Sequence, residues 1–359
     1  MDAAAAIALL RKLVEIESPT SSPGVLRVAE LMADELAARG AETSLLEGGH
    51  LRADLPGHGE PLAVIGHTDT VWPEGTLAAM PFAVDGDRAF GPGVYDMKGC
   101  LVVMLAAIDE AGESRRPLHV FLTADEEQGS HTARDPLRDV VEGVAAAFVV
   151  EPPTAAGHLK TARKGLGRFS VAIDGRPAHA GTNLLDGASA VEELAHQIIR
   201  LHALTDHERG VSVNVGVVSG GTRENVVAAY AEASLDVRVV HTADLGRIER
   251  ALQALEPVLE GTSIGVTGGW TRPPLEPTPA SRVLFAKAQE HARALGFEIE
   301  QASSGGGSDA NLVGALGVPV LDGLGIEGSG AHANDEHVRL DSLPVRAGLL
   351  ARLLEDPGL

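Results

Sequence analysis

Cysteine and aromatic residues are scarce in this chain. A single cysteine, Cys100, occurs among 359 residues, which excludes an internal disulfide framework and is typical of a reducing compartment. Cys100 lies in an apolar helical pattern without an evident partner base, so it is expected to pack rather than to act as a nucleophile. Aromatic residues make up only 3% of the sequence. The core must therefore be built mainly from Leu, Val, Ala and Ile.

Positive charge and long apolar runs are also lacking. The chain has 29 Lys and Arg against 50 Asp and Glu, a formal net charge of -21, which argues against nucleic acid or an anionic membrane as a partner because both attract clustered Lys and Arg. No apolar run approaches the length of a membrane span. Residues 2–15 have no basic leader and predict an amphipathic helix capped by Asp2 rather than a signal peptide. We therefore expect a cytoplasmic protein.

The expected secondary structure indicates an α/β domain in the first and last parts of the chain. Helices alternate there with strands that are apolar throughout, a pattern typical of a mostly parallel sheet buried on both faces. The first part predicts strands at 42–46, 50–53, 61–69, 118–123 and 145–150, and helices at 2–15, 25–39 and 101–111. The last part predicts a helix at 279–295, a strand near 297–301, a loop at 303–310, a strand at 319–321 and a helix at 341–354.

The segment between these parts has a different order of elements. It predicts, in turn, a strand (169–174), a helix (187–204), two strands (211–218 and 226–240), a helix (243–260) and a strand (263–268). This is the order of the ferredoxin-like β-α-β-β-α-β motif. The predicted fold is therefore an α/β domain formed by residues 1–164 and 270–359, with an α+β ferredoxin-like domain inserted at residues 165–269.

Three of the apolar strands end in residues that can bind metal ions. The strand at 61–69 ends in His67 and Asp69, the strand at 118–123 leads into the acids at 125–127, and the strand at 145–150 is followed by Glu151. An acidic run by itself is usually a solvated turn. However, adjacent carboxylates repel one another, and parallel sheets bind ligands at the carboxyl ends of their strands. The repeated ending favours a site in which one Glu binds a metal ion and its neighbour is a general base.

Two loops supply further candidates for the same site. Asp96 precedes the helix expected at 101–111, where an N-cap is the usual role of a lone Asp and a ligand is the alternative. His332 lies in the glycine-rich loop 328–336. Two imidazoles and three carboxylates suit two Zn²⁺ ions, with Co²⁺ or Mn²⁺ as alternatives. With Asp96 between the ions, such a centre would generate a hydroxide near neutral pH, and Glu126 would be free to transfer protons.

The chain is similar to the M20 family of metallopeptidases and amidohydrolases in six stretches that occur in order along nearly its whole length. These stretches are Gly66–Asp69, Gly91–Gly99, Asp125–Gly129, Val150–Pro152, Gly175–Gly181 and Gly330–His332. The resemblance implies a zinc-hydrolase catalytic domain with one zinc ion on His67, Asp96 and Glu151. It implies a second zinc ion on Asp96, Glu127 and His332. It also implies that Glu126 is the general base, that Asp69 supports a ligand, and that the peptide bond after Asp96 is cis.

The resemblance further implies that the inserted domain is a lid that also pairs two subunits in a homodimer. His179 would then stabilise the oxyanion in the active site of the other subunit, whereas an ordinary loop histidine is the alternative. Asn225, Arg238 and Arg272 match positions that resemble the family's substrate clamp. Arginine can grip a carboxylate with two hydrogen bonds; for Arg238 a cross-strand ion pair is the alternative. The loop with Gly306 lacks the lysine and spacing of a phosphate-binding loop, so a close backbone approach to substrate is expected.

These features predict a dinuclear zinc hydrolase of small peptides or N-acyl amino acids. It would cleave the amide bond before a C-terminal amino acid by attack of a metal-bridged hydroxide, with Glu126 as general base. The loops at 305–310 and 324–332 resemble the glutamate carboxypeptidase branch more than the desuccinylase branch. A deacylase of the acetylornithine deacetylase or desuccinylase type is the alternative. A third hypothesis is a metal-binding dimeric scaffold without turnover, which would have no need of the base Glu126.

Overall fold

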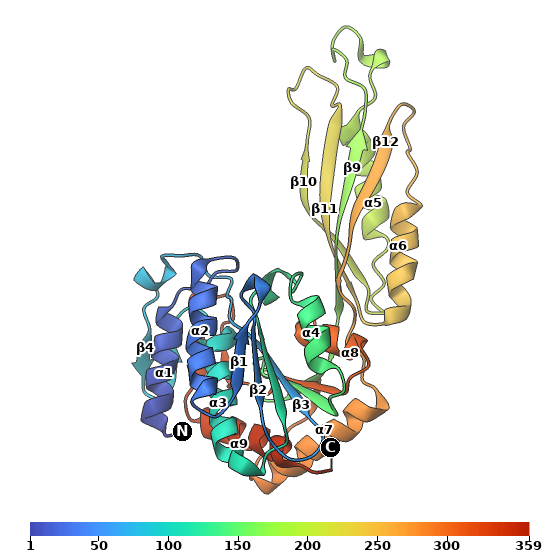
Figure 1. Cartoon of the computed structure of the whole chain (residues 1–359). Coiled ribbons are helices and arrows are strands. Elements are labelled where there is room, and N and C mark those ends of the chain that lie inside the picture. Colours follow the sequence, from blue (N-terminus) through green and yellow to red (C-terminus); the bar gives the residue numbers. More distant parts are fainter. Residues whose placement is uncertain (359) are drawn as a thin grey trace. The chain divides into compact units, whose positions relative to one another are not determined.

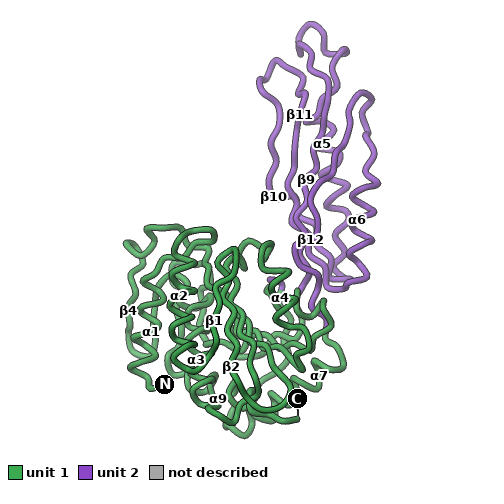
Figure 2. Tube along the Cα trace, in the orientation of Figure 1, with its two compact units in different colours: residues 1–162, 277–304, 308–359 green, residues 163–276, 305–307 purple. Residues whose placement is uncertain are grey.

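The computed structural model describes residues 1–358, and the chain divides into two compact units (Figure 2). Unit 1 comprises Met1–Ala162, Pro277–Ser304 and Ser308–Leu359, and unit 2 comprises Arg163–Glu276 and Gly305–Gly307. Unit 2 thus begins two residues before the insertion expected from the sequence, ends seven residues after it, and includes three residues of the later glycine loop. Among the described residues, no helix has both the length and the apolar character needed to cross a membrane.

Unit 1 contains an eight-stranded sheet whose four central strands are parallel. The strand order is β1 (Glu42–Leu45), β2 (Leu51–Leu55), β6 (Leu118–Thr123), β3 (Leu62–His67), β7 (Ala146–Val149), β14 (Val320–Asp322), β8 (Leu159–Arg163) and β13 (Gln301–Ser304). The strands β6, β3, β7 and β14 run parallel, with His67 in register with Thr123 and Ile65 in register with Val149. The carboxyl ends of these strands therefore lie along one edge of the sheet, and the predicted α/β class with a parallel centre is confirmed.

Helices cover both faces of this sheet, which explains why its central strands are apolar throughout. The helices are α1 (Ala3–Glu15), α2 (Pro23–Ala37), α3 (Gly99–Ala111), α4 (Arg134–Val141), α7 (Pro279–Ala294), α8 (Asp309–Ala315) and α9 (Ser342–Glu355). Figure 1 shows α1, α2 and α3 on one side of the sheet and α4 and α8 on the other. Successive side chains of a strand point to opposite faces, so every residue of β3 is buried.

Most predicted boundaries in unit 1 lie within a few residues of those in the structure. The predicted cap of the first helix is confirmed, because the Asp2 carboxylate accepts a hydrogen bond from the N–H of Ala5. Two expectations were wrong. The loop expected at 303–310 ends in α8, whose first turn is capped by Ser308, and the strand expected near 297–301 lies at Gln301–Ser304.

A second sheet in unit 1, which was not predicted, brings two loops together. Its order is β15 (Gly328–Ser329), β16 (His337–Arg339), β5 (Arg88–Phe90) and β4 (Ala83–Asp85). Strands of two or three residues are too short to show a hydrophobic period. The pairing of β16 with β5 holds the loop of His332 beside the segment Val94–Lys98.

Unit 2 has the ferredoxin-like arrangement. Its antiparallel sheet has the order β10 (Ser212–Gly220), β11 (Tyr230–Val239), β9 (Gly165–Asp174) and β12 (Ser263–Arg272). Alternate residues of these strands form a core of their own with α5 (Ala190–His202) and α6 (Leu245–Gln253). The helix expected to reach residue 260 ends at Gln253, because Pro257 cannot continue it. The strand expected from residue 226 begins at Tyr230.

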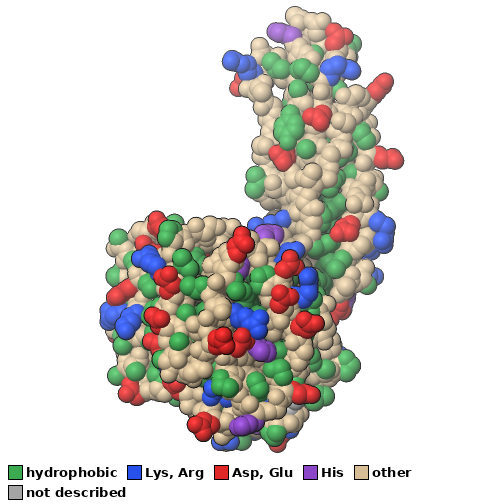
Figure 3. Space-filling model, in the orientation of Figure 1, with side chains coloured by type: hydrophobic (Ala, Val, Ile, Leu, Met, Phe, Trp, Pro, Cys, Tyr) green, Lys and Arg blue, Asp and Glu red, His purple; other side chains and the backbone are tan. Residues whose placement is uncertain are grey.

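Negative charge is dispersed over the face of the molecule that Figure 3 draws. Figure 3 shows Asp and Glu side chains spread over the face that is drawn, with Lys and Arg side chains between them. Within the described residues, the carboxylates that lie close enough to histidines to hold a metal ion are instead at the edge of the large sheet of unit 1.

Candidate metal centre

One set of three potential ligands surrounds the end of β3. His67 is the last residue of β3, Glu151 follows β7, and Asp96 lies in the segment before α3. The Nε2 atom of His67 is 3.1 Å from Oδ1 of Asp96 and 3.6 Å from Oε1 of Glu151. One donor atom from each of the three residues lies within 4.8 Å of the others. This spacing allows one divalent ion to reach all three donors.

A second set shares Asp96 with the first. Its members are Asp96, Glu127 and His332, and their donor atoms also lie within 4.8 Å of one another. The Nε2 atom of His332 is 3.3 Å from Oδ2 of Asp96 and 3.6 Å from Oε2 of Glu127. Asp96 therefore directs Oδ1 toward His67 and Oδ2 toward His332. A carboxylate in this position can bridge two metal ions.

The fully buried Asp69 carboxylate organises the end of β3 and the turn that follows β6. Its Oδ1 atom accepts a hydrogen bond from the N–H of Glu126 (3.2 Å), and its Oδ2 atom accepts from the N–H of Glu127 (3.1 Å) and from the hydroxyl of Thr20 (2.7 Å). The Nδ1 atom of His67 is 2.9 Å from the carbonyl oxygen of Asp69 and 3.3 Å from Oδ1. Asp69 thus fixes both the imidazole of His67 and the two glutamates.

Glu126 lies beside these ligands but belongs to neither donor set. It is the first residue of the short turn Glu126–Gln128, and it is half-buried. The backbone nearby has two unusual features. The peptide bond between Asp96 and Met97 is cis, which confirms that prediction, and His332 has a φ of 62°, in the left-handed region.

The electrostatics of the site favour bound cations. Burial by itself would lower the pKa of His67, but hydrogen bonds to Asp69 and Asp96 outweigh it and raise the pKa well above the ordinary value. Hydrogen bonds to Asp96 and Glu127 raise the pKa of His332 to about 10. Burial tends to raise the pKa of Asp96, yet its hydrogen bonds with His332 and His67 hold that pKa far below the usual range. In the metal-free site the two imidazolium groups thus supply the positive charge that the carboxylates require.

The residues fit a pair of divalent metal ions. Imidazole and carboxylate ligands in two sets of three suit Zn²⁺, Co²⁺ or Mn²⁺. Within the described part of the chain, Oε1 of Glu127 is among the few buried side-chain oxygens without a hydrogen-bond partner. An unpaired buried carboxylate oxygen is costly, and a cation in the second set would satisfy it.

We predict that metal binding at pH 7 releases protons from the two histidines. A ligand must be deprotonated before it binds a metal ion, and both histidines have raised pKa values in the metal-free protein. Calorimetric titration with Zn²⁺ in buffers of different ionisation enthalpy should therefore give a release of about two protons per chain. By the same linkage, the metal-free protein should lose stability as the pH rises from about 6.5 through the raised values. Heats that do not depend on the buffer would contradict this description.

Further residues support the acidic turn and were missed in the sequence. The buried His50 accepts a hydrogen bond at Nδ1 from the N–H of Ala124 (3.0 Å), and its Nε2 atom is 3.1 Å from the hydroxyl of Thr132. That hydroxyl donates to Oδ2 of Asp125 (2.9 Å). Burial lowers the pKa of His50, so the ring is neutral and donates from Nε2. His50 is isolated in sequence from every motif, and only the fold brings it to Asp125.

Asp309 supports the same turn from α8. This buried carboxylate accepts hydrogen bonds from the hydroxyl of Thr123 (2.8 Å) and from the hydroxyl of Ser130. Ser130 has a φ of 55° and closes the turn by donating its N–H to the carbonyl of Asp125. The glycine-rich sequence before Asp309 indicated a loop but not this contact.

The structure places His179 and Asn225 next to each other in unit 2. Their segments pair, and the N–H of Ala180 donates to the carbonyl of Asn225 (3.0 Å). Both side chains are exposed. The Nδ1 atom of His179 accepts hydrogen bonds from the N–H groups of Gly181 (3.1 Å) and Thr182 (3.2 Å). In the neutral ring, the proton is therefore on Nε2, and this N–H group is not used in the hydrogen bonds to Gly181 and Thr182.

The other clamp candidates also lie in unit 2. Arg238 donates from Nε and one terminal nitrogen to the two oxygens of Asp236 (2.7 and 2.9 Å), and from the other nitrogen to the carbonyl of Gly305 (3.0 Å). This ion pair lies along one strand rather than across two. Arg272 is buried at the end of β12, and a side chain at Gly307 would collide with it. The carbonyl of Gly306 accepts from Arg163 (3.1 Å).

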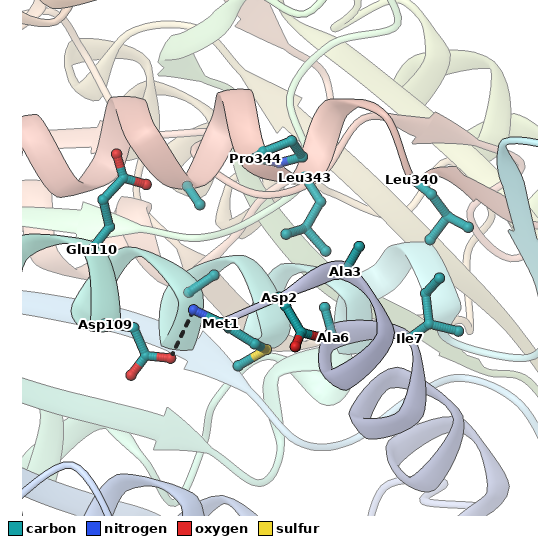
Figure 4. A pocket seen from close by; sticks show the side chains of 12 residues that line it. Met1, Asp2, Ala3, Ala6, Ile7, Asp109, Glu110, Leu340, Leu343 and Pro344 are labelled. Carbon is teal, nitrogen blue, oxygen red and sulfur yellow. Dashed lines mark ion pairs between the residues drawn. The ribbon is translucent and has the colours of Figure 1, made fainter.

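A separate pocket of about 350 Å³ lies between α1, α3 and α9. Figure 4 shows its apolar lining from Ile7, Leu340 and Leu343, with Asp109 at the edge, 3.4 Å from the amino group of Met1. It contributes no residue to either donor set.

Comparison with known proteins gives one family and several relatives. The family described as "Peptidase family M20/M25/M40" matches residues 63–356. Carboxypeptidase G2 from Pseudomonas sp. (strain RS-16) is 29% identical over 99% of this chain and 89% of its own. Succinyl-diaminopimelate desuccinylase from Gluconobacter oxydans (strain 621H) is 29% identical over 98% of this chain and 97% of its own. The structure of an M20 family metallo-carboxypeptidase from Sulfolobus solfataricus shares the fold, with a TM-score of 0.79, 18% identity and 99% of both chains covered.

Proposed function

The chain belongs to peptidase family M20/M25/M40 and is a hydrolase of amide bonds, and from this premise we propose that it is a dinuclear zinc carboxypeptidase. The observation that carries the proposal is the bridging position of Asp96 between two sets of potential metal ligands. Zinc is proposed because imidazole and carboxylate ligands suit it, with Co²⁺ or Mn²⁺ as alternatives. The substrate would be a small peptide or an N-acyl amino acid with a free carboxylate.

Each ion would be held by one histidine, one glutamate and the shared aspartate. His67, Asp96 and Glu151 would hold the first ion, and Asp96, Glu127 and His332 would hold the second. When bound, such a pair of ions activates water and polarises a carbonyl group. Asp69 would keep the His67 ring and the glutamate turn in place, since it hydrogen-bonds to both.

Glu126 would be the general base. It is adjacent to the ligand Glu127, its N–H is held by Asp69, and it lies outside both donor sets. Its carboxylate would take a proton from the attacking water and later give that proton to the leaving amine. A scaffold without turnover would not need a general base at this half-buried position.

We further propose that unit 2 pairs two subunits and that His179 acts in the site of the other subunit. β10 is the edge strand of its sheet, and Val217 and Val218 on β10 are more than half exposed. An exposed edge strand is a ready surface for pairing with another chain. The Nε2–H of His179 would donate to the oxyanion that forms during hydrolysis.

Mixing two inactive variants tests this shared site. We expect His179→Ala and Glu126→Ala homodimers to be inactive and their mixture to regain activity. A hybrid dimer has one intact site, so random exchange should restore about a quarter of the wild-type activity per chain. Subunit exchange would be verified with differently tagged chains. Exchange without recovery would place His179 in the site of its own chain or outside catalysis.

The substrate carboxylate would be gripped by Asn225, Arg238 and Arg272, with the backbone at Gly306 close to the substrate. Arginine can bind a carboxylate with two hydrogen bonds. Arg238 is already paired with Asp236, so it would bind substrate with its remaining N–H groups. All four residues lie in unit 2.

The alternative function is an N-acyl-amino-acid deacylase, which the similarity to succinyl-diaminopimelate desuccinylase supports. A panel that varies the leaving amino acid and the acyl group independently distinguishes the two. The proposed carboxypeptidase should discriminate among leaving amino acids and tolerate different acyl groups. Discrimination among acyl groups with indifference to the amino acid would favour the deacylase.

A further inference from the structure

A buried glutamate that belongs to neither donor set is hydrogen-bonded to the segment that carries Asp96. Glu336 is four residues after His332, and its side chain is fully buried. Its Oε1 atom accepts hydrogen bonds from the N–H groups of Tyr95 (2.9 Å) and Asp96 (3.0 Å). Its Oε2 atom accepts from the N–H of Gly93 (2.9 Å) and from Nε1 of Trp72 (2.7 Å). Four donors thus converge on one carboxylate.

The carboxylate of Glu336 is not needed for the pairing of the neighbouring strand β16. β16 begins at the next residue and already pairs with β5 and β15. A buried carboxylate is costly unless it is fully hydrogen-bonded, and a neutral side chain would avoid that cost. The contacts of Glu336 instead converge on the segment that carries the bridging carboxylate. This arrangement indicates a role in positioning.

We propose that Glu336 is a positioning residue that holds Asp96 and the loop of His332 in one geometry, so that both metal ions bind. The inference rests on the proposed dinuclear centre. Because Oε1 accepts from two successive N–H groups, it fixes the backbone from which the Asp96 side chain projects. Oδ1 of Asp96 is 3.1 Å from Nε2 of His67, and Oδ2 is 3.3 Å from Nε2 of His332. A shift of this backbone would therefore alter both sites at once.

The substitution Glu336→Gln tests this role with almost no change in shape. A carboxamide has one acceptor oxygen, and its NH₂ group cannot accept. Two of the four donors would therefore lose their acceptor and would face N–H groups instead. If the amide oxygen takes the place of Oε2, it still accepts from Gly93 and Trp72, but the N–H groups of Tyr95 and Asp96 lose their acceptor. If it takes the place of Oε1, the N–H of Gly93 and Nε1 of Trp72 lose theirs.

The matched control is Glu193→Gln in unit 2. Glu193 is also fully buried, and it accepts hydrogen bonds from Gln197, from the hydroxyl of Thr262 and from the N–H groups of Val258 and Leu259. The control therefore removes one buried carboxylate oxygen from a similar cluster of donors. It leaves the segment of Asp96 untouched.

The experiment compares Co²⁺ binding by the metal-free full chains, measured by competition with a chelator and by visible absorption. Wild type should bind two Co²⁺ ions. Glu336→Gln should bind them about 10–100-fold more weakly, the usual effect of losing a group that orients a ligand. At saturating Co²⁺ its d–d spectrum should also change, because the coordination by Asp96 changes. Glu193→Gln should match wild type in affinity and spectrum.

Wild-type affinities and an unchanged spectrum in Glu336→Gln would overturn the inference, even if the melting temperature fell. Fewer than two Co²⁺ ions on wild type would count against the proposed dinuclear centre instead. If Glu336→Gln does not fold, Trp72→Phe replaces it, because this variant keeps the carboxylate and removes one donor from Oε2. It should bind Co²⁺ severalfold more weakly with an altered spectrum, and wild-type behaviour would overturn the inference.

Discussion

Replacing Glu126 with glutamine is expected to lower kcat by about 10²–10⁴-fold, the usual contribution of a general acid or base, and to leave two metal ions per chain. Glu126 lies outside both donor sets, so its carboxylate is not needed for binding metal. The amide keeps the size of the side chain but cannot take a proton from water. The measurement is steady-state hydrolysis together with metal analysis of the same dialysed sample.

The neighbouring substitution Glu127→Gln is the matched control for this prediction. Glu127 is a member of the second set, so its variant should lose metal from that set, and excess metal should restore part of its activity. Added metal should do nothing for Glu126→Gln. Substantial turnover by fully loaded Glu126→Gln would remove the role of Glu126 as base, and loss of metal would make it a ligand.

Replacing Asp96 with alanine should weaken metal binding at both sites by more than about 100-fold. Groups that merely orient a ligand already contribute about 10–100-fold to affinity, and Asp96 is itself shared by both sets. In wild type, free metal at 100 times Kd should stabilise the fold by about 2.7 kcal/mol per site. The Asp96→Ala variant should show no such stabilisation, which a thermal melt with and without Zn²⁺ would reveal.

Glu151→Ala is the control for Asp96→Ala, because it removes a ligand of one ion and Asp96→Ala removes a ligand of both. Glu151 belongs only to the first set, so its variant should keep one ion bound more tightly than the other and retain part of the stabilisation. Loss of a single ion in Asp96→Ala would show that the two sets do not share this carboxylate.

The sequence could predict the ligands at strand ends because parallel strands impose a common edge. His67 ends one apolar strand and Glu151 follows another, and in the structure Nε2 of His67 is 3.6 Å from Oε1 of Glu151. Asp96 and His332 lie in irregular loops, so the sequence offered them only as candidates, and the similarity of the whole ordered set of motifs assigned each of them to an ion. Their meeting depends on the short strands β5 and β16, which have too few residues to show a pattern.

The residues that support the ligands could not be predicted, for a physical reason. Glu336 accepts hydrogen bonds from backbone N–H groups that lie 240 to 243 residues earlier in the chain. Any residue except proline offers such a donor, so nothing in the sequence of the partners identifies them. His50 is similar, because its partner is the N–H of Ala124. For Arg238 the sequence left a clamp and a cross-strand pair open, and the structure shows a pair with Asp236 on the same strand.

The most direct test of the central claim is a titration of the metal-free protein with Zn²⁺ during hydrolysis of an N-acyl glutamate. We predict release of free glutamate that rises to a plateau at two ions per chain, and no release from the same substrate with its α-carboxylate blocked as an amide. Full activity without metal, or two bound ions with no release from any N-acyl amino acid or dipeptide, would contradict the account.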